Sequence, residues 1–226
     1  MQGAMRTLRF ILLALLTLGG RAAQSQMPSD AEFEQAVAAA RPEALRLGMR
    51  LHTGTLWLTL LQARTPMMAS VSPGVCHIGY TAYPPRAEFS RLFPPLPAPD
   101  RVAWLAGFVR HELAHCAEMH SKYAVATSAM AADAASSGDG PQRWGEVLAD
   151  LAFALHVDRH APRGVELIER LATLRAERAA NDPGHDSSVA LRCYLALRGS
   201  ETAASTDWLA TLQVWRARCA DAEPAG

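Results

Sequence analysis

The stretch from Phe108 to His120, FVRHELAHCAEMH, constrains the fold more than any other part of the chain. His111 and His115 are four residues apart, and side chains at this spacing lie on one face of an α-helix. Asp100 can cap such a helix at its N-terminus. The pattern therefore predicts a helix over Val102–His120 that turns two imidazole rings toward one point.

Two imidazoles one turn apart can bind the same metal ion. Zinc binds imidazole nitrogen at about 2.0–2.1 Å, and a catalytic zinc site usually has three protein ligands and a water molecule. Glu112 lies about 100° round the helix from His111, so it can reach that water as a base without being a ligand. The alternative is that His111 and His115 are ordinary residues of an alanine-rich helix. A third ligand is needed to decide between the two.

The same helix does not supply the third ligand. Glu118 follows His115 by three residues, but about 10 Å of helix rise separates Glu118 from His111, which is too far for shared ligation. A histidine six residues after His115 would indicate a metzincin-like site, but Ser121 stands there and His120 is one residue short. Both Glu118 and His120 are therefore interpreted as exposed or supporting residues.

A second predicted helix, from Pro141 to about His160, offers two carboxylates. Glu146 and Asp150 are four residues apart in WGEVLADLAFAL, hence on one face. Glu146 could be the third ligand, and Asp150 could accept the outward N–H of a ligating histidine and so fix its ring. A solvated helix face is the alternative, because carboxylates are usually exposed. His156 and His160 repeat the spacing without a glutamate base and are interpreted as surface or capping residues.

HExxH followed one helix later by ExxxD resembles the gluzincin group of zinc metallopeptidases, the thermolysin-like superfamily. The match covers the two helices, with a looser likeness across Met67–Leu197. The resemblance implies one zinc ion per chain and a catalytic base acting on a water molecule on the zinc. The residues it implies are His111, His115 and Glu146 as ligands, Glu112 as the base and Asp150 as the partner of the first histidine.

The resemblance also implies a fold and a substrate. The fold is a zincin-like α+β domain, mainly α, with a small sheet whose edge strand packs on the active helix and a helical C-terminal part. Pro66–Tyr83 would hold an extended peptide or protein substrate. His185, in DPGHDSS, would stabilise the tetrahedral intermediate, with Arg192 and Tyr194 as weaker candidates. A loop histidine without a catalytic role is an equal alternative for His185.

The chain departs from the thermolysin pattern beside both carboxylates. That form has Asn before the glutamate and Ser before the aspartate, whereas this chain has Gly145 and Ala149. With 226 residues, the chain also leaves little room for a two-lobed peptidase. A compact gluzincin is the better comparison.

The N-terminus predicts export. Arg6 and Arg9 precede the apolar run Phe10–Leu18, and small residues suited to cleavage follow in GGRAAQSQ. Nine residues are too few to cross a bilayer core about 30 Å thick, which argues against a membrane anchor. We therefore predict a signal peptide over residues 1–23, one domain over residues 24–226, and a periplasmic or secreted protein without a stable anchor after cleavage.

Export changes the interpretation of the four cysteines. An even number in an oxidising compartment indicates disulfides, and four cysteines allow three connectivities. We predict Cys76–Cys116, which ties a strand to the active helix, and Cys193–Cys219, which ties two C-terminal helices. Buried free thiols are the alternative.

The remaining elements follow from turn and capping residues. Half of the residues are apolar, which predicts a packed core, and the formal net charge of zero gives no indication of nucleic-acid binding. Two short strands are expected around Pro73-Gly74, and six prolines between Pro84 and Pro99 indicate an irregular segment. The other expected elements are helices over Ala31–Ala40, Pro162–Ala180, Val189–Arg198 and Thr206–Cys219 and a strand over Thr53–Leu61.

Together these patterns predict an exported zinc metallopeptidase that hydrolyses peptide bonds with Glu112 as general base. Two alternatives come from other classes: a zinc-binding structural or binding protein without turnover, and a metal-free helical periplasmic adaptor. The sequence leaves the substrate, the choice between endo- and exopeptidase, and the oligomeric state open.

Overall fold

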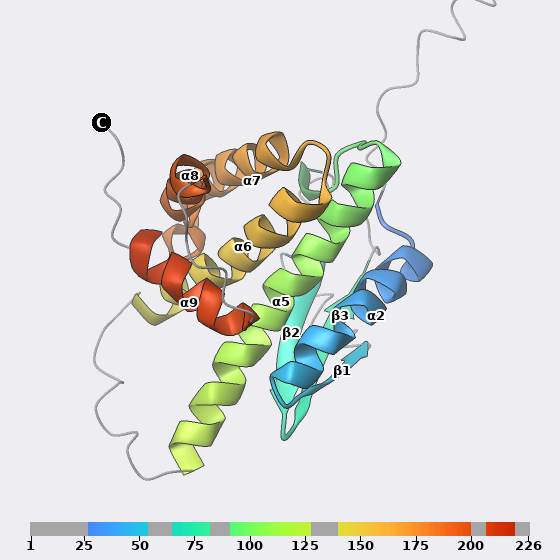
Figure 1. Cartoon of the computed structure of the whole chain (residues 1–226), viewed down its shortest axis with the longest axis vertical. Coiled ribbons are helices and arrows are strands. Elements are labelled where there is room, and N and C mark those ends of the chain that lie inside the picture. Colours follow the sequence, from blue (N-terminus) through green and yellow to red (C-terminus); the bar gives the residue numbers. More distant parts are fainter. Residues whose placement is uncertain (1–26, 54–64, 82–90, 128–139, 200–206, 220–226) are drawn as a thin grey trace, which may run out of the picture.

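A computed structural model describes residues 27–53, 65–81, 91–127, 140–199 and 207–219 (Figure 1). Over these residues the protein is mainly helical with one small mixed sheet, which confirms the predicted fold class. The elements are α2 (Asp30–Arg46), β1 (Arg50–Thr53), β2 (Met67–Ser72), β3 (Val75–Tyr80), α5 (Ala98–Thr127), α6 (Gly140–His160), α7 (Gly164–Ala179), the 3-10 helix η1 (Pro183–His185), α8 (Ser188–Leu197) and α9 (Trp208–Cys219). The predicted signal peptide lies outside the described residues.

The sheet has the strand order β1-β3-β2, so β2 is an edge strand of the described sheet. β1 runs parallel to β3, and β2 and β3 form an antiparallel hairpin. The hairpin turns at Pro73-Gly74, as predicted, and Gly74 has the positive φ of 70° that glycine tolerates best. The strand predicted over Thr53–Leu61 corresponds only at its first residue to β1, and its remainder lies outside the described residues.

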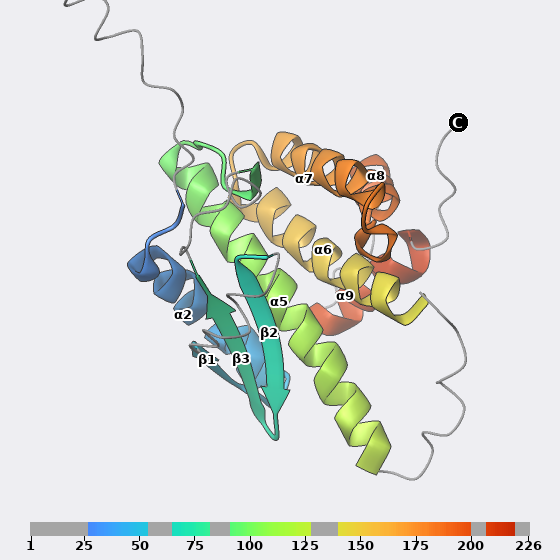
Figure 2. The ribbon, with the colours of Figure 1, turned by 180° about the vertical axis from the view of Figure 1, so that it is seen from behind.

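Helix α5 is the centre of the molecule. It contacts α2 and the hairpin on one side and α6 on the other (Figures 1 and 2). A helix covered on several sides must be apolar round most of its surface, and Trp104, Val109 and Leu113 are all at most 1% exposed. Although α5 has 30 residues, neither it nor another described helix is long and apolar enough to span a bilayer.

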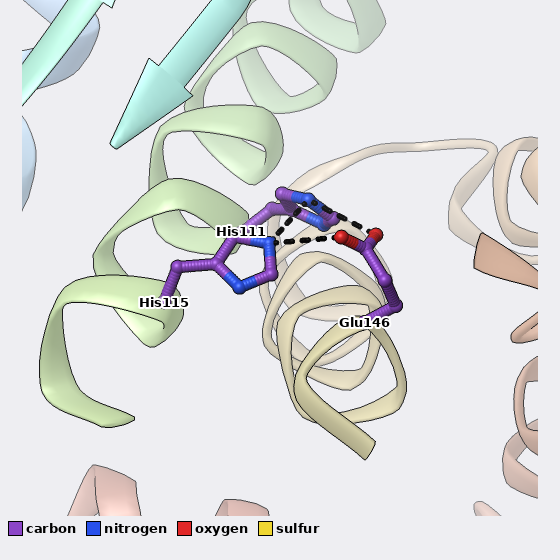
Figure 3. A group of neighbouring side chains, drawn as sticks. All are labelled: His111, His115 and Glu146. Carbon is purple, nitrogen blue, oxygen red and sulfur yellow. Dashed lines mark hydrogen bonds and ion pairs between the residues drawn. The ribbon is translucent and has the colours of Figure 1, made fainter. Parts of the chain in front are cut away.

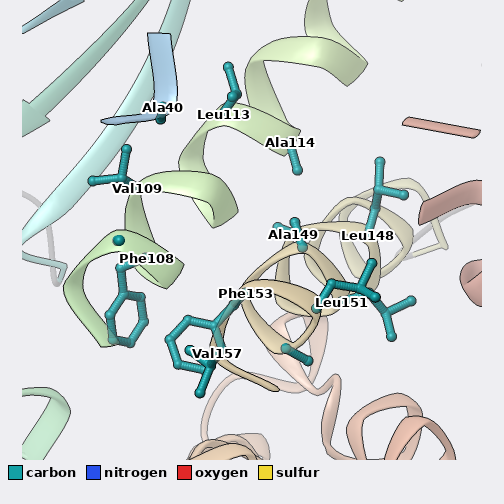
Figure 4. Close-up of a cluster of buried hydrophobic side chains, with 14 of the residues drawn as sticks. Ala40, Phe108, Val109, Leu113, Ala114, Leu148, Ala149, Leu151, Phe153 and Val157 are labelled. Atoms are coloured by element: carbon teal, nitrogen blue, oxygen red, sulfur yellow. The ribbon is translucent and has the colours of Figure 1, made fainter. Parts of the chain in front are cut away.

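Helices α5 and α6 approach closely at Gly107. A Cβ atom there would lie 2.8 Å from Phe153 Cδ2 and 2.9 Å from Val157 Cγ2, both on α6. The rings of Phe108 and Phe153 fill the space beside this contact, with centroids 4.9 Å apart (Figure 4). Because Gly107 is one turn before His111, this packing fixes the distance between the two helices beside the candidate site.

Both predicted disulfides are present. Cys76–Cys116 joins β3 to α5, and Cys193–Cys219 joins α8 to α9. Cys76 and Cys116 are both fully buried, so the first bond lies inside the packing between the sheet and α5. The sheet is thus bonded covalently to the helix that carries His111 and His115.

Two helix boundaries differ from the prediction. Helix α5 begins at Ala98, so Asp100 lies in its first turn and does not cap it. The Asp100 carboxylate instead accepts hydrogen bonds from the Arg163 backbone N–H (3.1 Å) and Nε (2.7 Å). Helix α2 continues through Pro42 to Arg46, and Ala40 and Ala44 on either side of Pro42 are fully buried in the core.

An ion pair between Glu32 and Arg101 joins α2 to α5. Arg101 Nε donates to Glu32 Oε1 at 2.7 Å, and Arg101 Nη2 donates to Glu32 Oε2 at 3.1 Å. Glu32 also accepts from Ser29 in the predicted capping box. The hydrogen bond from Arg101 is the main cause that lowers the pKa of Glu32 to about 2.

This pKa gives a stability prediction. Because the folded pKa of about 2 lies below the ordinary 4.5, the stabilisation by Glu32 is complete above about pH 4.5 and is lost as pH falls through about 2. The Glu32 side chain is 40% exposed, so we expect Glu32→Gln to lower the free energy of unfolding by at most about 1 kcal/mol at pH 7. Urea unfolding should show this difference closing near pH 2. A difference that stays constant as the pH falls would contradict the account. Glu34→Gln, at an exposed position of the same helix, serves as the control.

Candidate metal centre

Three predicted ligands converge between α5 and α6 (Figure 3). His111 Nε2 lies 3.2 Å from His115 Nε2 and 3.8 Å from Glu146 Oε2. His115 Nε2 lies 3.4 Å from Glu146 Oε1. Among the described residues, His111, His115 and Glu146 are the one group of three or more histidine, cysteine or acidic side chains able to hold a metal ion.

These separations suit a metal ion. Four ligands arranged tetrahedrally at about 2.0–2.1 Å from an ion are about 3.3 Å from one another, close to the distances between the three side chains. Beside the imidazoles lie the carboxylates of Glu112, Glu146 and Asp150 and the guanidinium of Arg175. Two imidazole nitrogens and a carboxylate oxygen are ligands of the kind that zinc takes in catalytic sites. The donor set therefore fits a divalent metal ion.

Asp150 holds the first histidine, as predicted. Its Oδ1 lies 2.7 Å from His111 Nδ1, and Asp150 is fully buried. A ligating histidine that donates its Nδ1–H to a carboxylate can offer the lone pair of Nε2 to a metal ion, and this contact gives His111 that orientation. Burial by itself would raise the pKa of Asp150, but the charges of Arg175 and His111 hold the pKa far below its usual range.

Arg175, which was not among the predicted site residues, completes this network. Arg175 Nε and Nη2 donate to the two Asp150 oxygens at 2.6 and 2.8 Å, and Arg175 Nη2 lies 3.6 Å from Glu146 Oε2. The Ser187 hydroxyl also donates to Asp150. A signal for Arg175 was present in the sequence: it falls at helical spacing from Ile168 and Leu171, on the apolar face of α7, where a charged residue requires a partner.

The carboxylates differ in their proton affinity. Burial raises the pKa of Glu146, but the hydrogen bond with His115 and the charges of His111 and Arg175 outweigh burial and lower the pKa to about 2. Burial also raises the pKa of Glu112, and nearby His111 and His115 only partly offset that effect. Glu146 is thus ionised and ready to ligate, whereas Glu112 is the carboxylate that binds a proton more readily.

Glu112 faces a cavity of about 350 Å³ together with the metal-binding group. The backbone segment from Thr65 to Ala69, which contains the first residues of β2, forms one wall. β2 pairs with β3 on one edge and with no described strand on the other, and it lies beside α5 (Figure 2). The structure therefore places an edge strand at the site, as predicted for Pro66–Tyr83, of which residues 82 and 83 lie outside the described part.

His185 is also brought to the cavity. Its Nδ1 lies 2.6 Å from Asp182 Oδ1, and its Nε2 lies 3.6 Å from Glu146 Oε1. Arg178 donates to the other Asp182 oxygen at 2.9 Å and fixes that carboxylate. Asp182 therefore orients the His185 ring so that Nε2 faces the metal-binding group.

The weaker candidates Arg192 and Tyr194 lie elsewhere. Arg192 is exposed on α8, away from the cavity. The Tyr194 hydroxyl donates to Asp158 at 2.9 Å, and its ring lies 4.7 Å from that of Trp215. Tyr194, which the resemblance suggested as a catalytic group, therefore takes part in the packing of α8 against α6 and α9.

The second histidine pair forms no comparable group. The rings of His156 and His160 are 4.4 Å apart, but no acidic or cysteine ligand in the described residues joins them. His160 is exposed, as predicted, whereas His156 is half-buried, which corrects its assignment to the surface. Burial, followed by the charges of Arg110 and His160, lowers the pKa of His156 to about 3.

No family model, curated protein or solved structure matches this chain. The interpretation of the site therefore depends on its own geometry: two imidazoles and a carboxylate at ligand spacing, a buried carboxylate beside them, and an edge strand along the cavity.

The metal centre predicts a selective loss of binding. Titration of the wild type with zinc, followed by calorimetry, should show one tight site per chain. His111→Ala and Glu146→Ala each remove a ligand, so each should weaken zinc by more than the roughly 10–100-fold typical of losing an outer partner. His160→Ala removes a histidine of the same spacing without a carboxylate ligand and should bind like the wild type. Equal affinities in all four proteins would disprove the site.

Proposed function

We propose that this chain is an exported zinc-dependent metallopeptidase. The observation that carries the proposal is the position of Glu112: a buried carboxylate beside His111, His115 and Glu146, facing the same cavity as the edge strand β2. A structural metal site needs a closed set of ligands, whereas a catalytic site keeps an open position and a base next to it. The cavity supplies the open position, and Glu112 supplies the base.

Bound zinc would supply a Lewis acid that polarises a peptide carbonyl and makes a water molecule more acidic. Glu112 accepts a proton from that water and later passes it to the leaving amine. Its raised pKa supports both transfers, because a carboxylate that holds a proton more readily is a better base and can return the proton.

His185 has the position of an oxyanion donor. Its Nδ1 is held by Asp182, and its Nε2 faces the cavity beside Glu146. With Nε2 protonated, His185 donates a hydrogen bond to the oxygen that becomes negative as the carbonyl is attacked.

The substrate is an extended peptide or protein segment. An edge strand can offer backbone N–H and C=O groups to an added strand, and the residues from Thr65 to Ala69 line the cavity wall. Pairing with β2 would place one peptide bond of the substrate in front of Glu112. Leu92, Phe93 and Phe108 also line the cavity, so its walls suit apolar side chains.

Export is part of the proposal. The two disulfides are of the kind that forms in an oxidising compartment, and the N-terminal segment has the composition of a signal peptide. The mature protein would then meet its substrate in the periplasm or outside the cell.

The test separates metal binding from turnover. Glu112→Gln keeps the shape of the site but removes the base, so we expect normal zinc binding and a fall in kcat of about 10²–10⁴-fold on a fluorogenic peptide library. Glu169→Gln, an exposed residue of α7, serves as a control that keeps full activity.

Full activity of Glu112→Gln would refute the proposal. A wild type that retains zinc but cleaves no peptide of the library would favour a structural or binding role for the metal. A wild type that neither retains zinc nor gains stability from it would favour the metal-free adaptor.

A further inference from the structure

The two histidines of the metal centre differ in what surrounds their outward nitrogens. His111 Nδ1 is bound by Asp150 of α6. His115 directs Nε2 at His111 and Glu146, so its Nδ1 turns away from them (Figure 3). The residue of α6 beside that Nδ1 is Gly145, which has no side chain to accept its proton.

A carboxylate from α5 lies in the space that Gly145 leaves empty. A Cβ atom on Gly145 would be 2.7 Å from Glu118 Oε2 and 3.8 Å from His115 Nδ1. Glu118 follows His115 by three residues, so both side chains are on one face of α5. The Glu118 carboxylate and the outward nitrogen of His115 therefore both lie within 4 Å of one point beside α6.

We propose that Glu118 is the positioning residue of His115: its carboxylate accepts the Nδ1–H of His115, directly or through one water molecule, and Gly145 is required to make room for it. A ligating histidine almost always donates its second N–H to such a partner, which fixes its orientation and raises its basicity. A bridging water serves nearly as well as a direct hydrogen bond. The proposal rests on the metal centre but not on peptidase activity.

The proposal explains a departure from the thermolysin pattern. That pattern has Asn where this chain has Gly145. An asparagine side chain at position 145 would start within 4 Å of His115 Nδ1 and could offer its own amide oxygen. In this chain the α6 residue has no side chain, and the acceptor comes from α5 instead.

If Gly145 had a purely structural role, Gly145→Ala would be expected to leave the zinc affinity unchanged. Glycine within a helix is less stable than alanine by about 1 kcal/mol, so Gly145→Ala would normally strengthen α6. If Glu118 instead occupies that space to hold His115, the added methyl group displaces the carboxylate and weakens the metal. Zinc affinity therefore distinguishes the two roles, because helix stability alone would not lower it.

The experiment measures zinc affinity by competition with a chelator at pH 7, using wild type, Gly145→Ala, Glu118→Ala and Glu118→Gln, with thermal unfolding of each apo-protein as a check on folding. We expect Gly145→Ala and Glu118→Ala to weaken zinc by about 10–100-fold. Glu118→Gln keeps an acceptor oxygen and should lose less. Glu169→Ala, exposed on α7, is the control and should match the wild type.

A double variant tests whether an acceptor from α6 can replace Glu118. Gly145→Asn/Glu118→Ala restores an acceptor from α6, and we expect it to regain most of the lost affinity. The proposal is overturned if Gly145→Ala binds zinc as tightly as the wild type, or if the double variant binds no better than Glu118→Ala. Failure of the wild type to bind zinc overturns the proposal and the metal centre together. Zinc binding without peptide hydrolysis contradicts only the proposed function, because the readout here is affinity.

Discussion

The buried pairing of Asp150 with Arg175 is the interaction on which the rest of the site depends. Asp150 is fully buried and Arg175 is 7% exposed, so neither charge could stay in the core alone. Asp150 accepts from Arg175, His111 and Ser187, which satisfies both of its oxygens. One carboxylate thus joins α5, α6, α7 and the start of α8, and the orientation of His111 follows from that junction.

The cavity is fixed from two sides by different means. On the helical side, close packing at Gly107 and the Asp150 network set the distance between the helices that carry the ligands. On the sheet side, the Cys76–Cys116 bond ties β3 to the residue that follows His115. Because β2 pairs with β3 along its whole length, the cavity wall is held to the helix that carries His111 and His115. The candidate ligands and the edge strand beside the cavity are thus held in place by separate contacts to α5.

The sequence predicts the parts of the site that depend on spacing within one helix. His111 with His115, and Glu146 with Asp150, are each four residues apart, and helical periodicity alone puts each pair on one face. The position of Arg175 on the apolar face of α7 indicates a buried partner, but the identity of that partner depends on how α7 packs on α6. The role of Ser187 likewise depends on how the start of α8 packs on α6, which no local pattern encodes. Tyr194 was misassigned for the same reason: its hydroxyl could equally have faced the cavity, and only packing directs it to Asp158. Asp100 is a residue type that often caps helices, but its carboxylate accepts a hydrogen bond from Arg163, which is far away in the sequence.

The central claim is that His111, His115 and Glu146 together bind a metal ion, and X-ray absorption at the zinc edge tests it most directly. The protein should be purified without added metal or chelator. The account predicts about one zinc per chain with two imidazole ligands and oxygen ligands at about 2.0–2.1 Å. A metal-free protein that stays empty after reconstitution, or zinc held by sulfur or without imidazole, would contradict it.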